Sequence, residues 1–444
     1  MTVQAIWFLQ VPITTIVKSN KRIMEKQEAS KRSQILCIIQ VIVEYLANIM
    51  LMDSFLAIIT KELGISTAGT GMLTSIKSAT SFFVLGALVF RKKRIKKYVL
   101  MTYCVGFIML LVYYIVPVVH METNHASLLL VVIPFVANVL INVFSSRRTA
   151  WFIALNDARN RAKVMAVKSA GSLGAAIVLK NALAYVYQIY LEKNEIDKYF
   201  ICCAIVMGIL VLINILCICF IEEPSYVELA EEEPRRLIAF EELLKNRKIW
   251  TIFRVTFIVA ICDALVTPFL GSYKMTDLGF SLSYDAMIVS ITSVIGCVFS
   301  FLWGIYADRR NCTYAYRKCM TVMAIAYAVN IFVVPENGKT AYLIFAFIQS
   351  IAAAGNTVTY SNMLFENIGI KDYSDVAVIS GVLGSVISFV TTSFASVVVS
   401  WIQGNGNMIL GMEIYPLQLL SVVTCVFYIL LIFCIKKLPK HYMF

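Results

Sequence analysis

The chain has 444 residues, of which 59% are apolar and only 15% are charged, and its mean hydropathy is +0.78. A soluble domain of this length must cover its surface with polar side chains, so the composition excludes one and indicates a polytopic helical membrane protein. The net charge of +12 does not indicate nucleic-acid binding, because the basic residues fall in short clusters between apolar runs.

The twelve cysteines do not describe a disulfide or metal framework. Only Cys312 and Cys319 fall in a predicted loop, and the others lie in apolar runs, where a thiol packs as a small hydrophobe. With only three histidines, the sequence offers few ligands for a metal site. It also contains neither a nucleophile–base–acid set nor a nucleotide-binding loop. We therefore expect no cofactor, no metal and no enzyme activity.

The chain begins with a segment that we expect in the cytoplasm. Residues 1–17 are apolar, but they are short for a span and contain Pro12, which favours an interfacial segment or one without a structural role. Residues 18–34 are polar and basic, which keeps an N-terminal tail, residues 1–34, on the cytoplasmic side.

Twelve apolar runs follow, each close to the length that crosses a hydrocarbon layer of about 30 Å. They predict a six-helix bundle over 35–221, a polar linker over 222–247 with an amphipathic helix at 236–246, a second six-helix bundle over 248–435, and a cytoplasmic tail over 436–444. The expected spans are 35–60, 69–90, 98–118, 127–150, 163–188, 199–221, 248–270, 284–306, 318–334, 340–362, 376–401 and 414–435.

The charges of the loops support this topology. Lys and Arg gather in the tails, in the linker and in every second loop, whereas the opposite side holds only Lys61, Lys193, Lys198, Lys274 and Lys339. One missed span would invert every later loop, so the bias places both termini in the cytoplasm and the chain in the cell membrane.

The two halves repeat each other. At a spacing of 210 residues Glu44 matches Arg254 and Asp53 matches Asp263, and Gly171 to Gly174 returns as Gly381 to Gly384; the turn Glu62 to Ser66 also resembles Asp277 to Ser281. Two halves of the same orientation are the parallel-repeat plan of certain transporters. Ionisable groups inside membrane spans are costly, which favours a functional site between the halves.

The loop after the eighth span reads Gly304-Ile305-Tyr306-Ala307-Asp308-Arg309-Arg310, with Arg317-Lys318 after it. This resembles the G-x-x-x-D-R…R-K signature of the major facilitator superfamily, and with the layout of two six-helix halves the resemblance covers about residues 35–440. It implies an all-α polytopic membrane protein of 12 transmembrane helices in two pseudo-symmetric six-helix bundles. It also implies a cytoplasmic gating loop formed by Gly304, Asp308, Arg309, Arg317 and Lys318.

Three features depart from patterns in that superfamily. Phe90 stands where the acid of the matching loop in the first half belongs. The fifth span has Gly171 and Gly174 but lacks the Gly-Pro kink of many drug exporters, and the fourth span has no arginine in its central part. The departures in the fourth and fifth spans weaken, without excluding, proton-driven drug export. Phe90 leaves the gating loop of the first half without its acid, which permits a non-transporting sensor or scaffold.

Two acidic residues of the first span suggest different roles. Asp53 lies at nearly the depth of Lys77, which predicts a structural ion pair, with a transport role as the alternative. Glu44 lies near the midplane and shares a helix face with Asn48, which makes it the leading candidate for ion coupling or solute contact. The structural alternative for Glu44 is a partner such as Lys168.

The second half supplies further candidates. Arg254 either extends to the headgroups or contacts solute or Glu44, and Asp263 lies deeper, before Pro268. We expect Lys180, near the outer end of the fifth span, to anchor at the headgroups. In the superfamily the first, fourth, seventh and tenth helices line a central cavity, which implies solute contacts or helix contacts for Asn138, Asn142, Gln349, Asn356 and Tyr360.

The expected function is secondary active transport of a small solute by alternating access between the halves. The expected partners are the solute, the lipid bilayer and a proton or another ion, and the chain is expected to be a monomer. An exporter of the same fold is one alternative. A non-transporting membrane sensor or scaffold is the other.

Overall fold

The computed structural model describes residues 13–85, 96–145, 148, 151–152, 155, 161–223, 247–368, 370–409 and 411–437. Within these ranges ten helices are long and apolar enough to cross a membrane. The two further expected spans correspond to the helices α3 and α14, so the structure is compatible with twelve. The linker helix expected at 236–246 and the loop position Phe90 lie outside the described residues.

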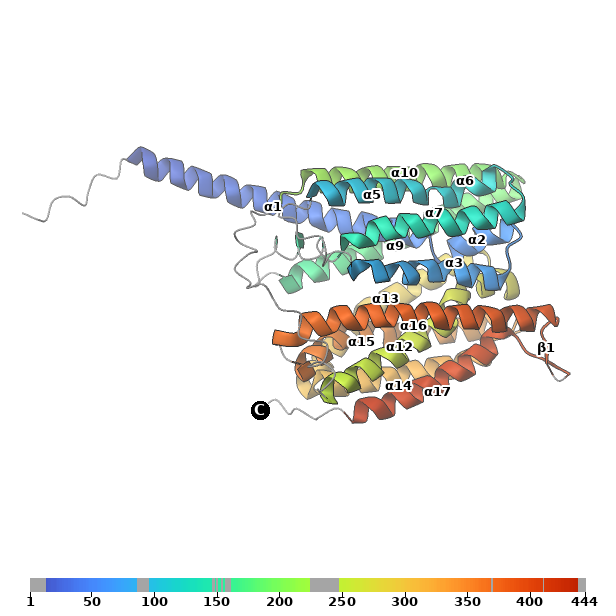
Figure 1. Cartoon of the computed structure of the whole chain (residues 1–444). Coiled ribbons are helices and arrows are strands. Elements are labelled where there is room, and N and C mark those ends of the chain that lie inside the picture. Colours follow the sequence, from blue (N-terminus) through green and yellow to red (C-terminus); the bar gives the residue numbers. More distant parts are fainter. Residues whose placement is uncertain are drawn as a thin grey trace, which may run out of the picture.

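Figure 1 shows two helical bundles side by side, with the start of α1 and the end of α17 at the same end of the molecule. We call that end the inner end and the opposite one the outer end. The N-terminal bundle contains α1 (Ile13–Met50), α2 (Asp53–Glu62), α3 (Thr67–Thr80), the 3-10 helix η1 (Ser81–Leu85), α5 (Lys96–Leu110), α6 (Val112–Val118), α7 (Thr123–Val143), α9 (Arg161–Glu192) and α10 (Ile196–Phe220).

The C-terminal bundle carries the only two strands of the described residues, a short antiparallel hairpin at its outer end. Its elements are α12 (Arg247–Ser272), the π-helix η3 (Tyr273–Asp277), α13 (Leu282–Arg310), α14 (Cys312–Asn330), α15 (Gly338–Ile368), α16 (Ile370–Gly404), β1 (Met408–Ile409), β2 (Met412–Glu413) and α17 (Pro416–Lys436).

The first transmembrane helix starts earlier than expected and is broken near its outer end. α1 begins at Ile13, just after Pro12, and contains neither Gly nor Pro, so no residue interrupts the helix before the apolar run. It ends at Met50, and α2 begins at Asp53, whose φ of 54° is left-handed. Aspartate tolerates this conformation better than most residues, and the break turns its carboxylate toward the other bundle.

The turn after this helix shows the repeat between the halves. Gly64 and Gly279 both have positive φ, at 67° and 62°. Two residues later, Ser66 and Ser281 cap the next helices, α3 and α13, each accepting a hydrogen bond of 3.2 Å from a backbone N–H three residues on. The resemblance between these two segments therefore reflects one shared turn.

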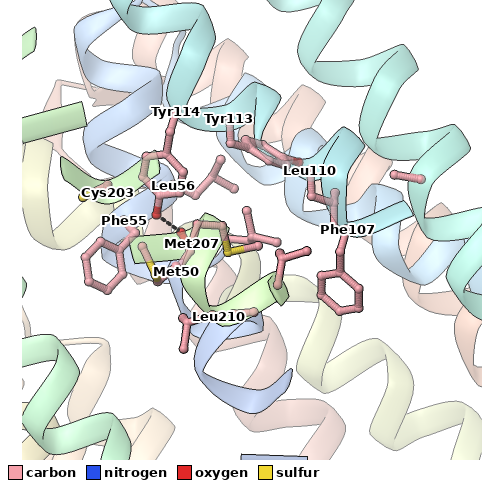
Figure 2. Packing of buried hydrophobic residues seen from close by; sticks show 14 of the residues in the cluster. Met50, Phe55, Leu56, Phe107, Leu110, Tyr113, Tyr114, Cys203, Met207 and Leu210 are labelled. Carbon is pink, nitrogen blue, oxygen red and sulfur yellow. Dashed lines mark hydrogen bonds between the residues drawn. The ribbon is translucent and has the colours of Figure 1, made fainter. Parts of the chain in front are cut away.

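Each bundle has its own apolar core. In the N-terminal core, Phe55 and Leu56 of α2 pack with residues of α6 and α10, and the Tyr114 hydroxyl donates to the Met50 carbonyl at the helix break (Figure 2). That bond satisfies a carbonyl that the break leaves without a helical partner. The cores meet at the outer end, where Leu282 of α13 joins the first core and Ala68 of α3 joins the second.

Candidate functional site

A polar cavity lies between the bundles, toward the inner ends of α12, α15 and α16. Its volume is about 460 Å³. Most of its polar lining groups are hydroxyls and one is a carboxylate; among the described residues no Lys, Arg or His lines it. The lining residues are Ser78, Thr256, Val259, Ala260, Asp263, Asn356, Tyr360, Leu364, Ser380, Gly381, Gly384, Ser385 and Ser388. We call this space the central cavity.

Three of the residues singled out in the sequence line the central cavity together: Asp263, Asn356 and Tyr360. Asp263 comes from α12, and Asn356 and Tyr360 come from neighbouring turns of α15. The Tyr360 hydroxyl lies 3.0 Å from the Thr256 hydroxyl, so a hydrogen bond joins the two helices at the cavity wall.

Asp263 is the charged residue of this wall. Its side chain is exposed to the cavity, and the Tyr428 hydroxyl donates to Oδ1 over 3.4 Å. Among the described residues no cationic side chain forms an ion pair with it. The carboxylate therefore faces the cavity without a countercharge.

Arg254 lies on the other side of the same helix. The lining residues Thr256, Val259, Ala260 and Asp263 recur at helical spacing along one face of α12, whereas Arg254 is about half a turn away from Asp263. Its side chain is exposed and forms no ion pair with a described residue, and Glu44 has a different partner. This placement favours the expectation of contact with the headgroups.

The remaining amides support helices rather than the cavity. Asn138 donates to the Pro134 carbonyl within α7 at 2.8 Å, and Asn142 of α7 donates to the Thr80 hydroxyl of α3 at 3.1 Å. Gln349 of α15 lies against the Tyr327 hydroxyl. These contacts favour the helix-to-helix alternative for Asn142 and Gln349, whereas Asn138 bonds within its own helix.

Glu44 lies in an ion pair within the N-terminal bundle. Both carboxylate oxygens accept from the guanidinium of Arg148, and Gln40 donates a further bond of 2.7 Å. The Arg148 guanidinium also lies 4.4 Å from the Tyr103 ring centre. The two charged side chains are 16% and 13% exposed, so this inner pair is largely buried. Lys168, the alternative partner expected, instead contacts the Cys37 thiol.

The expected ion pair between Asp53 and Lys77 was wrong. The Lys77 ammonium donates to Asn48 Oδ1 at 2.7 Å, and Asn48 in turn donates to the Glu44 carbonyl. The break at Asp53 explains the error, because a continuous helix was assumed in placing its carboxylate. Asn48 is therefore occupied by contacts inside the N-terminal bundle.

Asp53 belongs instead to a cluster of four charges that joins the two bundles at the outer end. Lys274 of η3 lies 2.9 Å from Asp53 and 2.6 Å from Asp285 of α13, and Lys180 of α9 lies 3.3 Å and 3.5 Å from the same two carboxylates. The Ser54 hydroxyl adds a bond of 2.6 Å to Asp285. We call Asp53, Lys180, Lys274 and Asp285 the outer charge cluster.

The outer charge cluster corrects the expectation for Lys180, which was placed at the headgroups but is only 7% exposed. Lys274 lies at the outer end as expected, but its side chain is only 5% exposed. A buried lysine needs a carboxylate nearby, and Asp285, which is fully buried, provides one for both. The sequence does not distinguish Asp285 from an ordinary helix-start residue, because it lies in the first turn of a span, where an acidic side chain commonly stabilises the helix N-terminus.

Close backbone contacts accompany the outer charge cluster. Gly271 of α12 packs on the backbone of Asp53, and Gly71 of α3 packs on the Phe269 ring, so a side chain at either glycine would collide with the other bundle. Ser272 donates to Thr67 at 3.1 Å, also between the bundles. The outer ends are therefore in direct contact.

The expected gating loop is placed only in part. Gly304, Asp308 and Arg309 end α13, and among the described residues neither Asp308 nor Arg309 forms an ion pair. The Arg317 guanidinium lies 5.0 Å, and the Lys318 ammonium 5.9 Å, from the ring centre of Tyr314. Phe90, the position of the first-half loop that matches Asp308, lies outside the described residues.

Glu366 of α15 holds the start of α14 at this loop. Its carboxylate accepts from the backbone N–H groups of Cys312 and Thr313, at 2.7 Å and 3.0 Å. A carboxylate at a helix N-terminus stabilises the helix, because its negative charge interacts favourably with the helix dipole. Burial, together with this carboxylate, raises the pKa of the Cys312 thiol to about 12, so the thiol is protonated at neutral pH.

The fold and the cavity define a polytopic membrane protein of two pseudo-symmetric helical bundles with a polar space between them. The family model of the Major Facilitator Superfamily matches residues 36–399. The chain belongs to this superfamily of membrane transporters.

Solved structures agree with that assignment at the level of fold. The crystal structure of the nucleoside transporter NupG superposes with a TM-score of 0.63 at 14% identity, covering 93% of this chain and all of that chain (100%). A bacterial homologue of the human lysosomal transporter Spinster, in an inward-facing and occupied conformation, gives a TM-score of 0.63 at 14% identity, covering 93% of this chain and 96% of that chain. The search of curated proteins returned no match.

Proposed function

We propose that the chain is a secondary active transporter that binds a small solute in the central cavity and releases it by alternating access. The observation that carries the proposal is the combination of a polar cavity of about 460 Å³ toward the inner ends with direct contact between the bundles at the outer ends. Such a cavity has the size of a small-molecule site.

The outer charge cluster suits a contact that opens and closes. Each bundle brings one lysine and one aspartate to it: Asp53 and Lys180 from the N-terminal bundle, Lys274 and Asp285 from the C-terminal bundle. If the outer ends separate, each bundle keeps an ion pair of its own, at 3.3 Å and 2.6 Å. The separation therefore leaves two neutral pairs rather than four unpaired charges, which lowers its cost.

We further propose that the gradient of a proton or another ion drives the cycle, and that the chain lies in the cell membrane with both termini in the cytoplasm. The loop charges support this orientation. The inner pair with Arg148 favours the structural alternative for Glu44, because a carboxylate held by a bidentate guanidinium resists protonation. Asp263, which faces the cavity without a countercharge, is then the better coupling or solute-binding candidate.

Counterflow in proteoliposomes tests the function. The purified chain is reconstituted, loaded with unlabelled solutes of several chemical classes, and diluted into the labelled solute, with and without a pH gradient. We expect transient accumulation of at least one solute class and stimulation by an ion gradient. Absence of exchange across a panel of amines, nucleosides, sugars and carboxylates would contradict the proposal and favour a non-transporting sensor.

A further inference from the structure

We infer that the central cavity recognises solutes through a protonated amine or guanidinium group that pairs with Asp263. The inference rests on the proposed transport function and names the substrate class of the same cavity. The first observation is charge: the described lining residues include one carboxylate and no cationic side chain. A carboxylate in such a place requires a cation, and an anionic solute would meet repulsion there.

Hydrogen-bonding capacity points to the same group. Two more lining residues, Asn356 and Ser380, each have a buried side-chain oxygen without a hydrogen-bond partner. Buried polar atoms are seldom left unpaired, and a carbonyl oxygen such as Asn356 Oδ1 can only accept. Asn356 Oδ1 and the Asp263 carboxylate therefore favour a ligand that donates N–H bonds, whereas the Ser380 hydroxyl, which can donate as well as accept, does not discriminate.

The ring of Tyr360 adds a third element. Tyr360 lines the cavity, and its ring centre lies 5.7 Å from that of Tyr316, so an aromatic pair stands at the wall on the α15 side. Aromatic faces attract ammonium and guanidinium groups. Carboxylate, acceptors and aromatic face together select a cationic donor over a neutral polyol, which needs hydrogen-bond partners but no charge.

The N-terminal bundle does not cancel this charge. Its described cations Arg148, Lys77 and Lys168 are each engaged elsewhere, with Glu44, Asn48 and the Cys37 thiol. Within the part of the chain that the structure describes, Ser78 is the one residue that this bundle contributes to the cavity lining, and it carries no charge. No described side chain therefore neutralises Asp263, which favours a countercharge from the solute, a small inorganic cation or a proton.

Three matched probes test whether the solute supplies the countercharge of Asp263: 2-phenylethylamine, its N-trimethylated cation and 2-phenylethanol. They share one apolar body and differ in charge and in N–H donors. Binding is measured by thermal stabilisation and isothermal titration with the purified full-length chain, its Asp263→Asn variant and the control Glu122→Gln, whose carboxylate lies exposed in an outer loop.

We expect wild type and Glu122→Gln to bind the amine at least about tenfold more tightly than the alcohol, with the trimethylated cation between them. Asp263→Asn should lose that preference. A preference of less than about threefold in wild type would overturn the inference even if Asp263→Asn failed to fold. Equal binding of the amine by Asp263→Asn would also overturn it.

Counterflow distinguishes failure of this inference from failure of the proposed function. Exchange of a neutral or anionic solute, with no exchange of the amine, would support the transport function and overturn the inference of a cationic substrate. Absence of exchange for probes of every charge would contradict the transport function itself. Amine exchange that Asp263→Asn abolishes would support both.

Discussion

Asp53 and Asp263 stand at matching positions of the two bundles, yet their surroundings are opposite. Asp53 follows a helix break and contacts two lysines, Lys180 and Lys274, at the contact between the bundles. Asp263 lies in an unbroken helix and faces the central cavity, and among the described residues its side chain has one hydrogen-bond partner, the Tyr428 hydroxyl. The repeat places an aspartate at both positions, and the local backbone decides whether the carboxylate pairs with lysines between the bundles or faces the cavity.

The two surroundings predict different losses of folding free energy when the aspartate or its partner is replaced. A buried charge that loses its partner costs about 3–5 kcal/mol, whereas a charge that has no protein partner can be removed without that loss. Residues of the outer charge cluster should therefore respond to substitution in stability. Asp263 should respond in transport instead.

The largest effect should come from Lys274→Met. It removes the closest partner of Asp285, whose side chain is only 1% exposed, and should cost about 3–5 kcal/mol. Folded yield and thermal unfolding in detergent measure the loss. Lys77→Met is the control, because Lys77 contacts the neutral Asn48 and should cost much less.

A second substitution tests whether the pairing itself matters. Adding Asp285→Asn to Lys274→Met removes the carboxylate left without its closest partner, and should restore part of the lost stability. Losses that simply add in the double variant would show that Lys274 and Asp285 are not energetically coupled.

The next effect should come from Glu44→Gln in the inner pair. The amide keeps one acceptor for Arg148 but loses the charge, and we expect a loss of about 2 kcal/mol, visible first as lower folded yield. Normal yield with lost gradient-driven transport and surviving exchange would instead make Glu44 the coupling residue. Loss of both transport modes at normal yield would make it a solute contact.

A direct comparison of Asp53→Asn with Asp263→Asn should give smaller changes of opposite kind. Asp53 is 37% exposed, so its loss should cost only about 1–2 kcal/mol, with transport reduced in proportion to folded protein. Asp263→Asn should leave stability unchanged or slightly higher while solute exchange falls at least about tenfold. Equal loss of stability in both variants would remove the contrast between the two positions.

The sequence predicted the overall organisation well, because membrane-spanning helices can be recognised from their apolar composition and from the charges of the loops between them. The family resemblance agrees with the matched family, and the twelve apolar runs are compatible with the ten candidate membrane helices and the shorter α3 and α14 of the described residues. Asp263, Asn356 and Tyr360 were singled out from depth and from the helices expected to line a cavity, and the structure gathers them in one.

The partners of the charges could not be predicted in the same way. Placing Asp53 beside Lys77 assumed a straight helix, and nothing in the sequence marks the left-handed residue that redirects the carboxylate. Lys274 resembled an ordinary loop lysine, since the π-helix that buries it depends on tertiary packing. Ion pairs between distant segments depend on rotation and depth together, which hydropathy does not resolve.

The smallest substitution, Gly271→Ala, tests the backbone contact between the bundles at the outer end. Gly271→Ala adds one methyl group where α12 meets the Asp53 backbone, and should push the outer ends apart. Labelling of a cysteine at Thr67 by a membrane-impermeant maleimide should become several-fold faster. Gly174→Ala is the control, because a methyl group there meets no atom within 4 Å. Equal labelling in both variants would show that the close approach at Gly271 does not hold the outer end closed.

A reversible cross-link at the outer end tests the central claim that transport requires the bundles to separate there. Thr67 and Ser272 lie on opposite bundles with their hydroxyl oxygens 3.1 Å apart, so cysteines at both positions should form a disulfide when oxidised. With the double variant in proteoliposomes, oxidation should abolish solute exchange and reduction should restore it, while either single variant stays active. Full exchange with the disulfide formed would contradict alternating access through the outer charge cluster.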